Sequence, residues 1–265
     1  MPALFESRNG LFIPGELTRG GWADDTQHGG PPAGILARAI DRVPTLVPMQ
    51  VVRFTVDLSR PVPLEPLRIE TTVVREGKRI QLVDARLAAD EVELGGARAL
   101  RIRIGELDLP VPDTDAMPAA PSELERLDWK GHFGEVDDLP RFHYDAVEIR
   151  TRCGSFHRPG PGTSWFRLRV PLVEGEAPSP FVRMAVLADM ANGNSQFLDP
   201  RLHAFINPDI GLYLHRMPEG DWIGMKSVSY PHPSGIGMTD TAVYDLEGRI
   251  GRIVQSQYID LRRRP

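Results

Sequence analysis

The sequence predicts an α+β fold in which two repeats each wrap an antiparallel sheet around one central helix. Apolar and polar residues alternate through several segments, beginning with Val52 to Leu58, and a period of two is typical of strands with one buried face. The same combination of one helix and several such strands occurs on both sides of a proline-rich stretch. Because a sheet with one apolar face needs a cover, a central helix in each repeat is the economical solution.

The first repeat, residues 1–108, is predicted to hold one helix and four strands. The helix spans 31–40, where Pro31 suits the first helical turn and apolar side chains gather on one side. Strands are predicted near 52–58, 67–75, 80–88 and 97–104. The alternating apolar residues of the first strand are Val52, Phe54, Val56 and Leu58, and those of the last are Leu100, Ile102 and Ile104, which alternate with Arg101 and Arg103.

The composition changes after Gly105, where prolines occur among acidic and small residues. This change predicts a linker at 109–142, with one short helix at Ser122 to Leu127. The second repeat, residues 143–265, then has predicted strands near 145–151, 164–170, 209–215, 222–230, 237–245 and 250–259. Its helix lies in the stretch RMAVLADMANGNS at 183–195, which carries Asp189 in an otherwise apolar run.

Open sheet edges predict how the repeats associate. Two units that pair edge to edge form one continuous sheet, and further exposed edges favour a homo-oligomer, a dimer or higher. The single cysteine, Cys153, excludes an internal disulfide and fits a reducing compartment, so we expect a cytoplasmic protein. A net charge of -5 argues against nucleic acid as a partner, and no window of eighteen apolar residues predicts a membrane span.

Five motifs together are specific enough to suggest a family. The motifs are HGGPPAGILAR at 28–38, PFVRMAVLAD at 180–189, FINPD at 205–209, LHR at 214–216 and VQ at 254–255. In this order they resemble the double-hotdog acyl-CoA thioesterases related to type II acyl-CoA thioesterase, and the resemblance covers nearly all of the chain. It implies a double hotdog fold, acyl-CoA as substrate, and hydrolysis of the thioester by water without a cofactor or a metal.

The resemblance also implies a site shared between the repeats. Hotdog thioesterases combine a glycine turn from one unit with an acid from the helix of the other. Here the first repeat keeps His28, Gly29 and Gly30 but has Arg38 where the second repeat has Asp189. The second repeat has Pro180-Phe-Val182 in place of the glycine turn. One composite site per chain is therefore expected, and its pseudo-symmetric twin is expected to be inactive.

In the family pattern, three side chains hold the attacking water, and they map onto Asp189, Gln255 and Asn207. Related type II enzymes carry threonine where Asn207 stands, which puts the position of the water in question. Asp189 is the expected general base, or the group that orients the water, with a pKa raised by its apolar surroundings. Direct attack by its carboxylate is the alternative. The Gln255 amide has a buried partner, which is either the water or a backbone carbonyl.

The glycine turn is the expected site of the thioester carbonyl. The first N–H groups of a helix have no partner within the helix, and Gly29 and Gly30 allow a substrate to approach the backbone. A plain helix start is the competing interpretation. His28 is expected to fix the turn through a hydrogen bond and His215 to pack within a strand, although both histidines are rivals of Asp189 as the base.

Two other functions remain open at this point. A hotdog hydratase for enoyl thioesters carries an aspartate and a histidine five residues apart, but Asn194 stands at that distance from Asp189. A non-catalytic module that binds acyl-CoA is the second alternative. No Gly-x-Ser-x-Gly elbow of a serine hydrolase occurs. Candidate partners of the coenzyme A phosphates are Arg38, Arg183 and Arg216.

Overall fold

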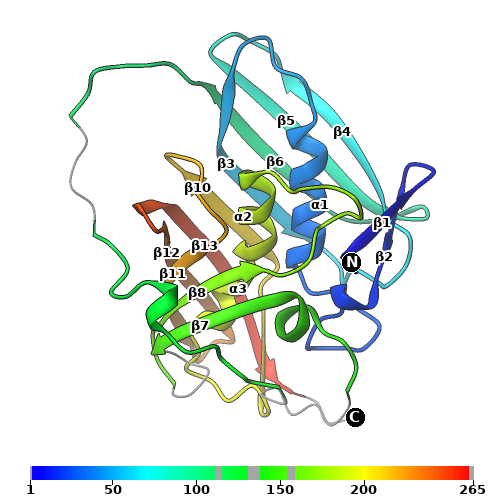
Figure 1. The fold of residues 1–265 in the computed structure, drawn as a ribbon. Helices are drawn as coiled ribbons and strands as arrows, with labels where there is room; N and C mark the ends of the chain where they lie inside the picture. The colour runs from blue at the N-terminus through cyan, green and yellow to red at the C-terminus, as the bar shows by residue number, and fades with distance from the viewer. Residues whose placement is uncertain (1, 111–114, 131–137, 154–158, 263–265) are drawn as a thin grey trace.

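A single antiparallel sheet runs through both repeats of the computed structural model, which describes residues 2–110, 115–130, 138–153 and 159–262 (Figure 1). The strand order is β4-β5-β6-β3-β10-β13-β12-β11-β8-β7, and β9 pairs with β13. The strands are β3 Met49–Leu58, β4 Arg68–Arg75, β5 Ile80–Ala89, β6 Val92–Arg103, β7 Val147–Cys153, β8 Gly162–Leu168, β9 His203–Ile206, β10 Asp209–Leu214, β11 Ile223–His232, β12 Ile236–Asp245 and β13 Gly248–Leu261.

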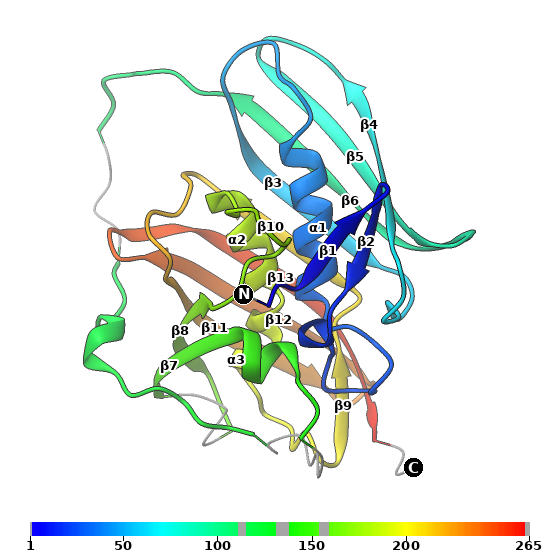
Figure 2. The ribbon, with the colours of Figure 1, turned by 45° about the vertical axis from the view of Figure 1, so that its right-hand side comes forward.

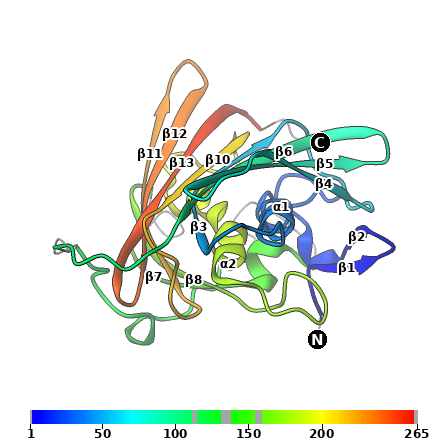
Figure 3. The same cartoon turned by 90° about the horizontal axis from the view of Figure 1, so that it is seen from above.

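The two halves of the sheet join where β3 pairs with β10, with Thr55 opposite Gly211. The expected edge-to-edge pairing of the repeats is therefore present, and the architecture is a double hotdog. Seen from above, the sheet curves around the helices α1, Gly30–Asp41, and α2, Pro180–Ala188 (Figure 3). A division of the chain at residues 108 and 142 stays a prediction.

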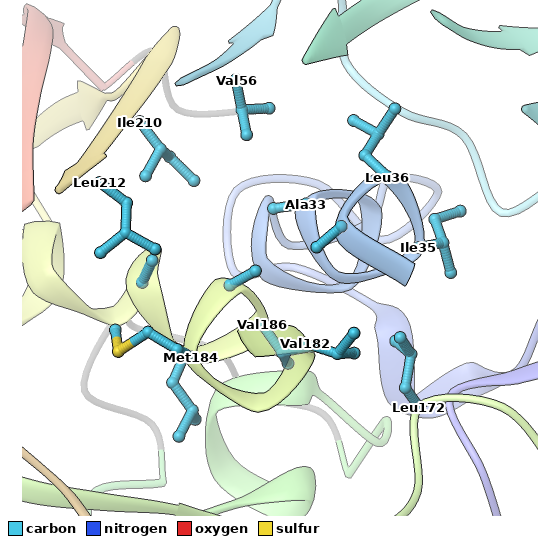
Figure 4. Packing of buried hydrophobic residues seen from close by; sticks show 14 of the residues in the cluster. Ala33, Ile35, Leu36, Val56, Leu172, Val182, Met184, Val186, Ile210 and Leu212 are labelled. Carbon is cyan, nitrogen blue, oxygen red and sulfur yellow. The ribbon is translucent and has the colours of Figure 1, made fainter. Parts of the chain in front are cut away.

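Each central helix carries proline in its first turn, Pro31 in α1 and Pro180 in α2, and the fixed backbone angle of proline suits this position. In α2 the Ser179 hydroxyl also accepts a hydrogen bond from the Val182 N–H at 3.2 Å, which caps the helix. Both helices are almost entirely buried, because the sheet covers one side and they contact each other on another. Figure 4 shows Ala33 of α1 near Val186 of α2 at the junction between the helices.

The helices approach closely because α1 carries glycine on the side that faces α2. A Cβ at Gly30 would overlap the backbone oxygen of Val186, and a Cβ at Gly34 would overlap the Cγ2 of the same residue. Neither position has room for a side chain. The end of α2 is therefore held against the start of α1, where the motif at 28–38 begins.

The burial of β6 is opposite to the pattern that its apolar residues suggest. Ile102 and Ile104 are exposed, whereas Arg101 is buried and faces α1. Arg101 donates hydrogen bonds to the backbone oxygens of Ile40 and Val43, at the end of α1. In β3, similarly, a register irregularity between Val51 and Arg53 buries Val51 more deeply than Val52. An interaction with helix carbonyls cannot be read from alternation alone.

Several small elements were not predicted. A hairpin of β1, Phe5–Arg8, and β2, Leu11–Pro14, lies beside α1 (Figure 2). Short turns of 3-10 helix occur at Glu16–Thr18 and Pro121–Glu123, and the second replaces the helix expected at 122–127. A π-helical turn spans Phe142–Ala146, and a short helix α3, Met190–Asn194, follows α2.

The predicted linker packs against the second repeat over much of its described length. The Trp165 indole N–H donates to the Ala119 oxygen at 2.8 Å, and the Asp115 carboxylate accepts from Lys226 at 2.9 Å. Leu127 and Trp129 are buried. Residues 111–114 and 131–137 of this linker lie outside the described residues. Within the described residues, no helix is long and apolar enough to cross a membrane.

Replacing Arg101 with leucine is expected to lower the free energy of unfolding by about 3 kcal/mol, because two helix-end carbonyls and the Gln81 side-chain oxygen lose their donor. Arg103→Leu, two residues along the strand at an exposed position, is the matched control and should change it by no more than about 0.5 kcal/mol. Denaturant titration of both variants measures the difference. Equal losses would contradict the helix-end role of Arg101.

Candidate active site

Asp189 lies between α2 and α3, and only 6% of it is exposed. Because α2 ends against the start of α1, the carboxylate of Asp189 lies beside the glycine turn of the first repeat. A Cβ at Gly29 would lie 2.8 Å from the Asp189 Oδ2. Any side chain at position 29 would therefore collide with the Asp189 carboxylate, so this position requires glycine. The expected meeting of acid and glycine turn is present in the geometry, and their chemical roles remain to be tested.

Four groups donate toward the Asp189 carboxylate. Oδ1 accepts from the Asn207 Nδ2 at 2.6 Å and from the Gln255 Nε2 at 3.3 Å. Oδ2 lies 2.8 Å from the His28 Nδ1, and the backbone N–H of Gly29 also donates to the carboxylate. Four residues predicted for the site therefore surround the acid. Three contact it through side chains, and Gly29 contacts it through its backbone N–H.

This environment changes the expected ionisation of Asp189. Burial by itself raises the pKa of its carboxyl group, but the charge and hydrogen bond of His28, together with the donors Asn207 and Gly29, outweigh burial and hold the pKa below its ordinary value. The start of α1 adds the favourable end of a helix dipole. The expectation of a raised pKa is wrong, because the hydrogen-bond donors around the acid outweigh the effect of burial.

A chain of buried amides fixes the orientation of Asn207. The Asn207 Oδ1 accepts from the Asn192 Nδ2 at 3.0 Å, and the Asn192 Oδ1 accepts from the Gln257 Nε2 at 2.6 Å. Gln257 Nε2 also donates to the Thr239 hydroxyl at 2.9 Å. Each amide can satisfy its neighbours in only one orientation, so the nitrogen of Asn207 points toward Asp189. Asparagine here supplies a donor to the carboxylate.

Gln255 is fully buried in β13 and contacts the acid through its nitrogen. Its Oε1 is buried and accepts no hydrogen bond from the described residues. A backbone N–H or a bound water is the usual partner of such an oxygen. The amide therefore has an open acceptor immediately beside Asp189.

The site opens into a cavity of about 480 Å³. Trp22 and Phe205 both line it, and their ring centroids lie 5.1 Å apart in an edge-to-face contact. Trp129 and His143 also line it, and sequence reasoning missed both because they belong to, or directly follow, the predicted linker. An isolated tryptophan in a proline-rich stretch was the available signal that the stretch is packed. The cavity walls are mostly apolar, as a binding site for an acyl group requires.

The arginines suggested for phosphate binding lie elsewhere. Arg38 pairs with Glu176 at 2.6 Å, Arg216 pairs with buried Asp245, and Arg183 donates to the Gly220 oxygen at 2.8 Å. None of them lines the cavity, whereas Arg60 does. Arg38, which stands where the second repeat has Asp189, thus lies with Glu176 near the start of α2.

The two candidate histidines differ in their surroundings. His215 is exposed just beyond β10 and does not pack within a strand, so that expectation is wrong. His28 lines the cavity and its Nδ1 also lies 3.1 Å from the Gly30 N–H, as expected for a residue that shapes the turn. Asp189 and His28 thus form an Asp–His pair across the repeats, which the spacing within one repeat did not predict. Among the described residues, no three His, Cys, Asp or Glu side chains gather as a metal ion needs.

Comparison with protein families identifies the chain. Residues 18–102 match the acyl-CoA thioesterase N-terminal domain, and residues 114–259 match the acyl-CoA thioesterase C-terminal domain. The chain belongs to the acyl-CoA thioesterase family. A comparison of this chain with curated protein sequences found no match.

Solved structures show the same fold. A hot dog protein of unknown function from Alicyclobacillus acidocaldarius superposes with a TM-score of 0.75 at 16% identity, covering 97% of this chain and 95% of that one. Acyl-CoA thioesterase II from Mycobacterium marinum gives 0.67 at 16% identity, covering 98% and 96%. The tesB protein of Mycobacterium avium subsp. paratuberculosis gives 0.67 at 15% identity, covering 96% and 95%. At such identities the likeness establishes the double hotdog fold of this family member.

Asn192→Asp is expected to reverse the amide chain. The new carboxylate still accepts from Gln257 but cannot donate to Asn207, so Asn207 turns its nitrogen away from Asp189 and presents its oxygen. The pKa of Asp189 should then rise, and turnover should fall by about tenfold or more, as for loss of a donor to a charged group. Asn9→Asp, the same charge change at an exposed turn, should leave turnover unchanged. Equal turnover in both variants would contradict the orienting role of Asn192.

Proposed function

We propose that this chain hydrolyses acyl-CoA thioesters to a free acid and coenzyme A, with water activated at the Asp189 cluster. One observation carries the proposal: an ionised carboxylate from the second repeat lies 2.8 Å from His28, in the glycine turn of the first repeat. Membership of the acyl-CoA thioesterase family supports the same activity.

The described groups meet the chemical requirements of thioester hydrolysis. The open Gln255 Oε1 can accept a hydrogen bond from a water held beside the Asp189 carboxylate. The start of α1 lies beside the cavity-lining residues His28 and Gly29, and the positive end of its helix dipole favours the negative charge that gathers on the carbonyl oxygen. Asn207 holds the charge of Asp189 in place. The apolar cavity wall, with Trp22 and Phe205, suits the acyl chain.

A second candidate, hydration of an enoyl thioester, is favoured by the Asp189–His28 pair, since an acid and a histidine are the groups such a reaction uses. Both reactions can be measured on the same enoyl-CoA, because hydrolysis releases a thiol and hydration removes the conjugated double bond. Acyl-CoA binding with neither signal would favour the non-catalytic binding module.

Location and assembly belong to the proposal as well. The cytoplasmic location follows from the single cysteine and stays a prediction. The homo-oligomer also stays a prediction. Exposed apolar side chains of the first repeat, which include Val73, Val74 and Ile102, are the surface that such an association would cover.

Asp189→Asn should reduce the release of coenzyme A by about 100-fold or more, because the site loses its fixed anion. The measurement is a free-thiol assay across acyl-CoA chain lengths, with circular dichroism to verify the fold. Asp221→Asn, which neutralises an exposed carboxylate 3.7 Å from Arg183, is the matched control and should keep the wild-type rate. A wild-type rate in Asp189→Asn would remove the acid from the mechanism.

A further inference from the structure

We infer that the Nε2 of His28 is the general base that takes the proton from the attacking water, and that Asp189 orients the imidazole ring. This inference deepens the proposed hydrolysis and rests on it. The arrangement is an Asp–His dyad assembled from the two repeats, with the acid at the end of α2 and the histidine at the start of α1.

The distance between the two residues fixes where the ring proton lies. An imidazole nitrogen and a carboxylate oxygen 2.8 Å apart must share a proton, because two bare lone pairs would repel. The other donors keep Asp189 ionised, so the proton resides on the His28 Nδ1. A protonated Nδ1 cannot also accept from the Gly30 N–H, which faces this nitrogen from 3.1 Å, so in this tautomer that contact is not a hydrogen bond.

Asp189 is itself a poor base. Its two oxygens already face four donors, so a proton arriving from water would displace one of these hydrogen bonds. The same donors hold its pKa below the ordinary value, which further weakens it as a proton acceptor. A carboxylate so surrounded is suited to orienting a neighbour and stabilising its positive charge.

The second ring nitrogen of His28 is suitably placed. Nε2 makes no hydrogen bond with the described residues and is not enclosed by them, and the ring lines the cavity. The ring is held between Asp189 and the ring of Phe142, whose centroid is 4.8 Å away. The other titratable or charged groups along this cavity are His143, 5.8 Å from His28 ring to ring, Arg60 and Tyr258.

The proposed step conserves atoms and electrons. Nε2 accepts one proton of the water, whose oxygen forms a bond to the thioester carbonyl carbon as the C=O π electrons move onto oxygen. The positive end of the α1 dipole, at the start of the helix beside His28, favours the negative charge on that oxygen. The intermediate then collapses, the C–S bond breaks, and the coenzyme A thiolate leaves with the proton from Nε2. The products are a carboxylic acid and a thiol, and His28 is again neutral.

Chemical rescue tests the base role. His28→Ala should lower kcat by about 100- to 10,000-fold, and added imidazole should restore part of the rate in a saturable manner. More basic imidazoles should rescue better. A residue that only shapes the turn would give a slow variant that imidazole does not rescue. His215→Ala, at the exposed histidine, is the matched control and should keep the wild-type rate without responding to imidazole.

Nitrogen-15 NMR of labelled histidine provides an independent readout of the ring. When the imidazole of His28 is neutral, its single ring proton should lie on Nδ1 and leave Nε2 bare. The signal of this Nδ1 proton should shift in Asp189→Asn. A ring protonated at Nε2 contradicts the inference, as does an unrescued or fully active His28→Ala. Those results would not contradict the proposed hydrolysis of acyl-CoA by the wild-type protein. A wild type that hydrolyses no acyl-CoA overturns the base role and the proposed function together.

Discussion

The close crossing of α1 and α2 is the constraint on which the rest of the structure depends. Two glycines, Gly30 and Gly34, remove the side chains that would otherwise separate the helices, and the backbone and side chain of Val186 occupy that space. The crossing holds the end of one helix against the start of the other. Acid and glycine turn therefore meet inside one chain, where they would otherwise belong to separate subunits, and the curved sheet in Figure 3 covers both helices.

Burying Asp189 at this crossing requires donors, and the donors determine its chemistry. His28, Asn207, Gln255 and Gly29 together make the ionised form the stable one. Their arrangement depends in turn on the amides behind them, Asn192 of α3 and Gln257 of β13, which fix the orientation of Asn207. The site is thus an anion held by an ordered polar network, and the group most available to accept a proton is the histidine that the anion orients.

Local patterns in the sequence predicted most of the fold. A proline in the first turn located α1, the apolar run at 183–195 located the helix that carries Asp189, and period-two alternation located the long strands. The family resemblance implied that Asp189 faces the glycine turn that follows His28. The errors arise from interactions between distant segments. Arg101 is buried because it satisfies helix-end carbonyls, which a strand pattern cannot show. Donors from the β9–β10 turn and from the turn before α1 lower the pKa of Asp189. Because these segments are distant from Asp189 in the sequence, the apolar run around the acid does not reveal them.

Unfolding free energies of Gly34→Ala, Val186→Ala and the double variant test the crossing most directly. At an ordinary helical position, glycine to alanine raises stability by up to about 1 kcal/mol. Here the added methyl group would overlap the Val186 Cγ2, so Gly34→Ala should lower stability, and Val186→Ala in the same chain should recover part of the loss. A stabilising Gly34→Ala, or costs that simply add in the double variant, would contradict the account.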